Sequence, residues 1–135
     1  MKMIDIREYI ASFLESKHPD VLVNGVEKSR VHSEDAPDDA IYPYIVYDLP
    51  NSVKGNSMEN FVFELDFWDN KTDTTELEIL CDHVNNDQDG LDGKTLLVTE
   101  TLGLTFYLEN RRQLRDPDKQ LKRRQYVYQV RAHGA

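Results

Sequence analysis

Apolar residues recur at helical spacing in two segments of the chain and at alternate positions in several others. The first segment predicts an amphipathic helix that ends at His18-Pro19, since its polar residues fall between the members of one apolar stripe. That stripe consists of Ile6, Ile10, Phe13 and Leu14. The second segment predicts a helix that ends near Asn85-Asn86, where Asp73 and Glu76 have the spacing of a capping box. Its stripe consists of Leu77, Leu80, Cys81 and Val84.

Alternating apolar and polar residues predict strands between the two helices and after them. Residues 42–47 and 61–68 are rich in aromatic and β-branched side chains, and we expect them to pair in one antiparallel sheet, joined by a polar connection over 50–56. Residues 95–110 predict one strand, or two strands broken at Gly103, and residues 121–131 predict the last strand.

Turn-forming residues separate these strands. Asp116-Pro117-Asp118-Lys119 predicts a tight turn, because proline presets φ and aspartate bonds its own backbone. Near the N-terminus, Asn24-Gly25 predicts a small hairpin within residues 20–31. The acidic stretch Ser33 to Ala40 holds little apolar mass, so we expect a mobile surface loop there. The whole pattern predicts an α+β fold with two helices packed on one face of a mainly antiparallel β-sheet.

Size and composition favour one domain over residues 1–135, because a chain of this length buries enough surface to fold without metals or disulfides. Cys81 is the only cysteine, which excludes an internal disulfide and suits a reducing cytoplasm. Apolar runs are too short to cross a bilayer, and charges occupy the N-terminus where a signal peptide needs its apolar stretch. We therefore expect no membrane partner.

Charge divides the chain in two. Residues 1–110 carry 8 basic and 23 acidic side chains, a balance of −15, whereas residues 111–135 carry 8 and 2, a balance of +6, which together give the net charge of −9. An acidic protein of this kind disfavours nonspecific binding to nucleic acid. The two regions should attract each other between copies, because electrostatic complementarity fixes partner choice and register.

The basic region has two interpretations. Its arginines could simply be solvated charges that discourage edge-to-edge aggregation. Alternatively they could pair with carboxylates of a neighbouring subunit, for which the planar guanidinium is well suited. The candidates lie on both sides of the predicted turn and are Arg111, Arg112, Arg115, Lys122, Arg123 and Arg124.

Signals of catalysis or metal binding are weak. Asn85 to Gly90 matches the first half of a calcium loop, but Leu96 stands where the bidentate glutamate belongs, so a solvated turn is the better interpretation. Cys81 lies on an apolar stripe and is most simply a core residue. Glu64 and Asp66 occupy the outward side of a strand without a predicted pocket. We expect no catalytic residue, no metal and no cofactor.

The motifs, taken in order, resemble the tail terminator or tail completion proteins of long-tailed bacteriophages. The resemblance rests on the strand at Tyr42-Pro43, on Phe63 to Trp68 with the following Asp69-Asn70 and helix, and on Arg111 to Asp118 leading to Tyr126 to Arg131. It covers most of the chain, but not residues 20–40. Such proteins are short α+β domains without enzymatic activity.

The resemblance implies a hexameric ring that caps the tail tube, ends its growth and docks to the filled head. The implied partners are further copies of the chain, the major tail tube protein and a head-completion or connector protein, while DNA passes through without specific binding. Assembly would occur in the bacterial cytoplasm and the product would sit in the virion tail. Two alternatives stay open: a head-side connector of the same particle, and a small acidic adaptor that binds a basic peptide. The interface residues implied are Arg111, Arg112, Arg115, Asp116, Asp118, Arg123 and Arg124.

Overall fold

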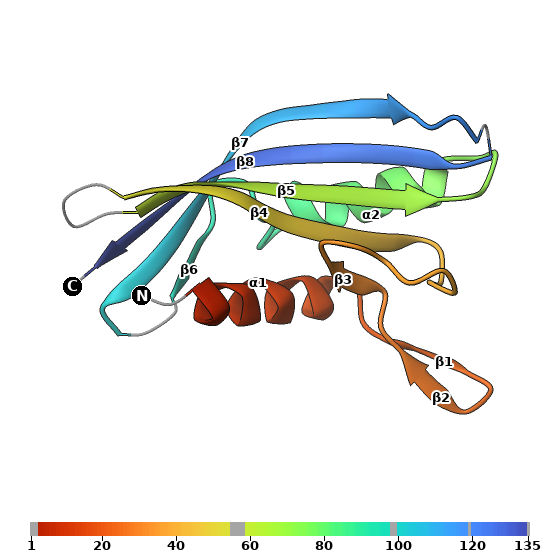
Figure 1. Cartoon of the computed structure of the whole chain (residues 1–135), viewed down its shortest axis with the longest axis horizontal. Helices are drawn as coiled ribbons and strands as arrows, with labels where there is room; N and C mark the ends of the chain where they lie inside the picture. The colour runs from red at the N-terminus through yellow and green to blue at the C-terminus, as the bar shows by residue number, and fades with distance from the viewer. Residues whose placement is uncertain (1–2, 55–58, 98–99, 119, 135) are drawn as a thin grey trace.

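The computed structural model describes residues 3–54, 59–97, 100–118 and 120–134. Six strands form one sheet in the order β3-β4-β5-β8-β7-β6, and two short strands form a separate hairpin (Figure 1). The elements are α1 (Met3–Lys17), β1 (Val21–Val23), β2 (Val26–Lys28), β3 (Val31–Ser33), β4 (Tyr44–Lys54), β5 (Glu59–Asp69), α2 (Thr75–Asn85), β6 (Thr95–Leu97), β7 (Leu102–Arg115) and β8 (Lys122–Gly134). Every neighbouring pair in the sheet is antiparallel except β3 and β4. The predicted α+β class is confirmed.

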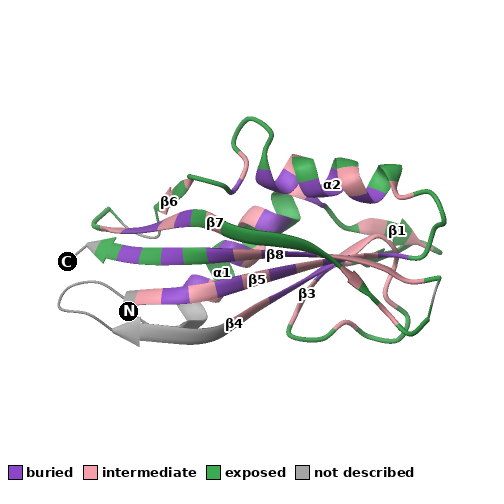
Figure 2. Ribbon diagram, turned by 90° about the horizontal axis from the view of Figure 1, so that it is seen from above, coloured by how far each residue is buried: buried purple, intermediate pink, exposed green. Residues whose placement is uncertain are grey.

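Both helices cover the same face of the sheet, as predicted. Their apolar stripes join the inward residues of the central strands in one cluster, which includes Phe63, Phe106 and Tyr128. Burial alternates residue by residue along β5 and along β8 from Tyr126 onward, as Figure 2 shows, because successive strand residues point to opposite faces. The other face of the sheet is not covered by either helix, and it carries Asp66, Trp68 and Arg123.

The N-terminal hairpin forms around Asn24-Gly25, but its second strand is shorter than predicted. It ends at Lys28, and Val31 begins the new strand β3, which runs parallel to β4. The Ser29 hydroxyl accepts a hydrogen bond from the Val31 N–H, and the Arg30 carbonyl accepts one from the Ile45 N–H at 2.8 Å. These bonds turn the chain out of the hairpin and into the edge of the sheet.

The prediction of a polar connection over residues 50–56 was wrong for residues 50–54. Strand β4 continues to Lys54, with a register shift between Asp48 and Asn51. The segment between them contains Pro50, which has no N–H to give to a ladder. Backbone pairing with β5 holds the rest of β4 in the sheet although its side chains are polar, which is why the sequence pattern missed it. Residues 55–56 lie outside the described part of the chain.

The start of α2 also differs from the prediction. Asp73 Oδ1 accepts hydrogen bonds from the N–H and the hydroxyl of Thr75, at 2.9 and 2.6 Å. Glu76 forms an ion pair with Lys71 instead of completing a capping box. The predicted apolar stripe and the end of the helix are confirmed.

The C-terminal half forms a long hairpin. The predicted break at Gly103 was wrong, because Gly103 lies inside β7 and the two strands are separated after Leu97. A Cβ at Gly103 would come within 3.0 Å of the His133 ring. Strand β7 runs on to Arg115, so its basic residues extend the sheet. No helix among the described residues is long and apolar enough to cross a membrane.

Candidate assembly surface

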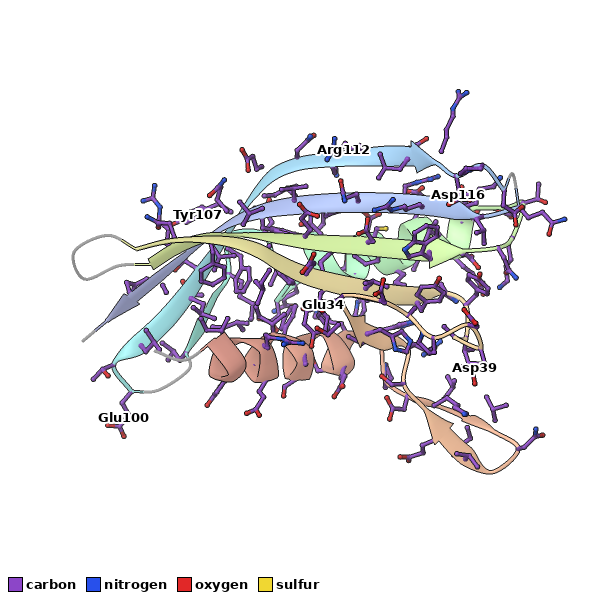
Figure 3. All side chains as sticks on the ribbon, in the orientation of Figure 1. Glu34, Asp39, Glu100, Tyr107, Arg112 and Asp116 are labelled. Atoms are coloured by element: carbon purple, nitrogen blue, oxygen red, sulfur yellow. The ribbon has the colours of Figure 1, made fainter. Side chains whose placement is uncertain are left out.

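The residues proposed for an interface gather at one end of the β7–β8 hairpin, which we call the basic tip and define as residues 111–124. Arg111, Arg112 and Arg115 lie on β7, and Arg123 and Arg124 lie on β8. Figure 3 labels Arg112 and Asp116 at this upper edge of the molecule. The basic tip carries seven basic and two acidic residues, a balance of +5.

A bulge in β7 decides which side each arginine takes. The register shifts between Leu108 and Asn110, so that Arg111 pairs with Tyr126 and Arg112 pairs with Gln125. Tyr126 belongs to the helix-covered face, and Gln125 to the open face. Strand alternation places Arg111 and Arg112 on opposite faces of the tip, and the bulge sets which face each one takes.

Arg123 is held on the open face by two neighbours from β5. Its Nε donates to Asp66 Oδ1 at 2.9 Å, and its guanidinium carbon lies 5.0 Å from the centre of the Trp68 ring. Trp68 in turn stacks with Tyr44, at 6.4 Å between ring centres. This arrangement forms a row across β4, β5 and β8 in which the cation is partly desolvated.

Arg124 lies on the other face and pairs with α2. Its Nε donates to Glu78 Oε1 at 2.7 Å. The acid partners of Arg123 and Arg124 thus come from the same chain, which neither of the two interpretations of the basic region included. Strand alternation placed Asp66 on the outward face correctly, but only the paired register of β5 and β8 shows that Arg123 reaches it.

The three arginines of β7 in the basic tip have no acidic partner among the described residues. Arg112 donates to the Gln125 amide oxygen at 2.7 Å, and Arg111 bonds Tyr126. Among the described residues, no carboxylate forms an ion pair with Arg111, Arg112 or Arg115. These three charges are exposed, and they are the ones that the fold leaves for a partner.

Asp116 and Asp118 shape the turn between β7 and β8. Asp116 Oδ1 accepts the Asp118 N–H at 2.9 Å, and Asp118 Oδ1 accepts the Gln120 N–H at 3.0 Å. The predicted turn chemistry is confirmed. Both carboxylates thus stabilise the backbone of the turn between Arg115 and Lys122.

A groove of about 760 Å³ opens at the basic tip, and we call it the tip groove. Its apolar lining comes from Leu114, Pro117 and Leu121. Its charged lining consists of three bases and one acid, which are Arg115, Lys122, Arg124 and Asp116. The groove was not predicted from the sequence, because the prediction for this segment used its charged residues and not the apolar residues between them. Leu114 lies between Arg112 and Arg115 in the sequence, and an apolar residue in such a basic segment is the signal that could have indicated the groove.

The outer edge of β7 is open next to this groove. Strand β6 pairs only with residues 103–105, and the preceding segment bonds the backbone of Phe106 and the Leu108 N–H. In the described part of the chain, no strand covers β7 beyond Leu108. An unpaired edge of this kind can accept another strand, and positive side chains restrict which one.

Opposite charge lies at the opposite edge of the sheet. Residues 20–39 contain six acidic and two basic residues, a balance of −4, and they comprise the β1–β2 hairpin, β3 and the loop after it. Figure 3 labels Asp39 near this hairpin, across the sheet from Arg112. The mobility expected for the loop from Ser33 to Ala40 stays a prediction.

The other candidate sites resolve into structural roles. Asn85 Oδ1 accepts the Tyr128 hydroxyl at 2.5 Å, and Asp89 pairs with Lys94, so the calcium-like segment is tied to the protein's own side chains. Cys81 is buried in the core, and burial raises the pKa of its thiol to about 12. Among the described residues, no group of three or more histidine, cysteine, aspartate or glutamate side chains could hold a metal ion.

Comparison with known proteins places this architecture in a class. The chain matches a solved structure from "Virion of native gene transfer agent (GTA) particle" with a TM-score of 0.63 and 14% sequence identity, over 96% of this chain and 98% of that one. At this identity the match shows a shared fold. A search of the curated proteins found no relative by sequence.

The family model named Tail completion protein gp17 matches residues 16–133. The protein is therefore a structural component of a phage-like tail. Within that class, the chain belongs to the tail completion protein gp17 family, which confirms the resemblance noted in the sequence. The matched segment includes the basic tip and residues 20–39, which we call the acidic edge, so both belong to the part of the chain that the family shares.

Proposed function

We propose that the protein forms a hexameric ring that caps the tail tube, ends tail elongation and joins the tail to the head. The observation that carries the proposal is the position of two oppositely charged surfaces at opposite edges of one sheet. A contact between two different surfaces of identical copies is heterologous, and such a contact closes into a ring when its rotation is right. The family and the fold support a tail location for this ring.

The subunit contact is proposed to run between the basic tip of one copy and the acidic edge of the next. Arg111, Arg112 and Arg115 provide the cations, because the described acids of their own chain do not neutralise them. Arg123 and Arg124 support the surface from within, through Asp66 and Glu78. Asp116 and Asp118 hold the turn that presents it.

The ring would contact the major tail tube protein on one side and a head-completion or connector protein on the other. Its net charge of −9 suits a channel through which DNA slides, since acidic walls do not bind phosphates. The role requires assembly and no catalysis, and we propose that residues 1–135 act as one domain in it.

Deletion of the gene followed by negative-stain electron microscopy tests this role. Filled heads beside detached tails of irregular length would support it. Tailless heads with free tails of normal length would instead assign the protein to the head-side connector. Intact particles would refute both, and would favour an adaptor that acts outside the particle.

A further inference from the structure

The β1–β2 hairpin, which we call the arm (residues 21–28), stands away from the rest of the molecule (Figure 1). Among the described elements, neither helix and no strand of the large sheet makes extensive contact with it. A two-stranded hairpin alone in water is marginally stable at best. Lys28 Nζ lies 3.9 Å from Asp39 Oδ2 in the loop after β3, but Leu22 is left exposed, so a surface outside the chain could stabilise the arm by covering it.

The arm is prepared for docking by its turn and its base. Asn24 and Gly25 have φ angles of 52° and 79°, which is the conformation that matches the twist of a two-residue hairpin. At the base, the Arg30 guanidinium donates two hydrogen bonds to the Pro19 carbonyl, at 3.2 and 2.9 Å. A preset shape and a fixed base reduce the ordering cost of binding.

One face of the arm combines an apolar side chain with a carboxylate. Leu22 pairs directly with Glu27 across the two strands, so both side chains point to the same side. Leu22 is 71% exposed, the largest exposed fraction among the large hydrophobic residues described. Val26 is 56% exposed and belongs to the other face, opposite Val23.

The tip groove has the matching composition. Leu114, Pro117 and Leu121 provide an apolar lining, and Arg115 provides a cation beside it. Its volume of about 760 Å³ exceeds the space that one leucine side chain fills, so the arm can enter with neighbouring atoms. The arm is attached to edge strand β3 and the groove lies at the end of β7, so within one chain the two are at opposite edges of the sheet.

We propose that Leu22 on the arm of one copy occupies the tip groove of the neighbouring copy, where Glu27 pairs with Arg115. Each subunit then gives one arm and receives one, as a closed ring requires. The arm itself carries one acid and one base, Glu27 and Lys28, but the segment that contains it, residues 20–39, has a balance of −4. That balance and the basic balance of the tip favour this occupant over a peptide of positive charge. The inference rests on the proposed ring and specifies the contact that holds it together.

A disulfide cross-link tests the contact directly in assembled particles. Leu22→Cys and Leu121→Cys are combined in one chain, and the particles are oxidised and run on a non-reducing gel. We expect a ladder of cross-linked oligomers, because a disulfide needs its two Cβ atoms within about 4.5 Å. Val26→Cys with Leu121→Cys is the matched control from the opposite face of the arm, and it should cross-link far less. The natural Cys81 is buried and should not contribute.

A charge exchange provides a second test that leaves Leu22 in place. Glu27→Arg or Arg115→Glu alone should each weaken assembly about tenfold. The double variant should restore it, since the ion pair is re-formed with its signs reversed. Restoration would also show that both single variants fold, because the same two substitutions are present.

The results separate this inference from the proposed function. A ring of this chain that shows neither cross-linking nor restoration would overturn the arm contact and leave the ring intact as a proposal. Intact particles after gene deletion would overturn the ring itself. Cross-linking with the Val26→Cys control as efficient as with Leu22→Cys would refute the assigned face of the arm.

Discussion

The Tyr128 hydroxyl donates a hydrogen bond to Asn85 Oδ1 at 2.5 Å, and both side chains are buried. The bond joins the last residue of α2 to the centre of β8, and so fixes the helix on the sheet. It also uses the first residue of the segment that resembles a calcium loop. Burial raises the pKa of Tyr128 well above its usual range, so the hydroxyl keeps its proton and remains a donor.

Tyr128→Phe should destabilise the protein by about 1–3 kcal/mol, because the Asn85 oxygen would stay buried without a donor. Urea unfolding followed by fluorescence measures the change. Tyr9→Phe is a suitable control, since Tyr9 is 42% exposed on α1 and water can take the place of its hydroxyl. An equal stability of the Tyr128→Phe variant and the parent would contradict the role assigned to this bond.

The pH dependence of stability should depend on His18. Burial lowers the pKa of His18 from 6.5, and this effect exceeds the opposing effect of the hydrogen bond between Nε2 and the Pro43 carbonyl at 2.7 Å. The unfolded chain therefore binds the proton first as the pH falls. Stability is complete above about pH 6.5 and decreases below it, toward the folded-state pKa.

His18→Gln should reduce this decrease between pH 7 and pH 5, although it can lower stability at every pH. Unfolding free energies of the two proteins at several pH values provide the comparison. Burial also lowers the pKa of His32, so a smaller dependence of the same sign should persist in the variant. If the two proteins lose stability in parallel over this range, His18 is not the responsible group.

Cys81 should be unreactive in the folded protein. It is fully buried, and a thiol pKa of about 12 leaves almost no thiolate at pH 8. Treatment with a thiol reagent such as iodoacetamide, followed by mass spectrometry, should show modification only after denaturant is added. Rapid modification of the native protein would mean that α2 opens from the sheet more readily than its packing indicates.

Arg115→Glu should weaken assembly of the ring about tenfold or more while the subunit stays folded, because Arg115 is exposed and forms no ion pair with a described acid. Arg131→Glu is the matched control, since Arg131 is an exposed arginine of β8 away from the basic tip. Circular dichroism tests folding, and the fraction of finished particles tests assembly. Equal particle yields for the two variants would count against the proposed interface.

Gly90→Ala should destabilise the turn after α2 by about 1–3 kcal/mol. A Cβ there would lie 2.5 Å from the Asn85 carbonyl oxygen and 2.7 Å from that of Asp87. Both are backbone atoms, so neither can move without shifting the end of the helix. Thermal unfolding should show a lower midpoint, and an unchanged midpoint would mean that the turn relaxes freely.

The sequence predicts those helices and strands whose own apolar residues recur with the helical or the alternating strand period. The stripes of both helices and the alternation from Phe61 to Trp68 are of this kind, since burial and spacing agree in them. The second half of β4 is different, because it is polar and joins the sheet only through backbone bonds to β5. Strand β3 was missed for a different reason, because its three residues are too few to show a period.

The basic tip was predicted from charge alone, and its inner organisation was not. Arg123 meets Asp66 and Trp68 because β5 and β8 are neighbours in the sheet, although they are far apart in the chain. The pattern of residues within each strand does not show which strands are neighbours in the sheet. The tip groove depends on the same long-range arrangement, as its lining comes from the hairpin and from Thr74 near α2.

Cryo-electron microscopy of the tail end that joins the head would show the proposed ring itself. We expect a sixfold ring of this chain at the end of the tube, with the basic tip of each copy against the acidic edge of the next. A density for the chain elsewhere in the particle would contradict it. So would a ring in which Arg111, Arg112 and Arg115 face away from the neighbouring subunit.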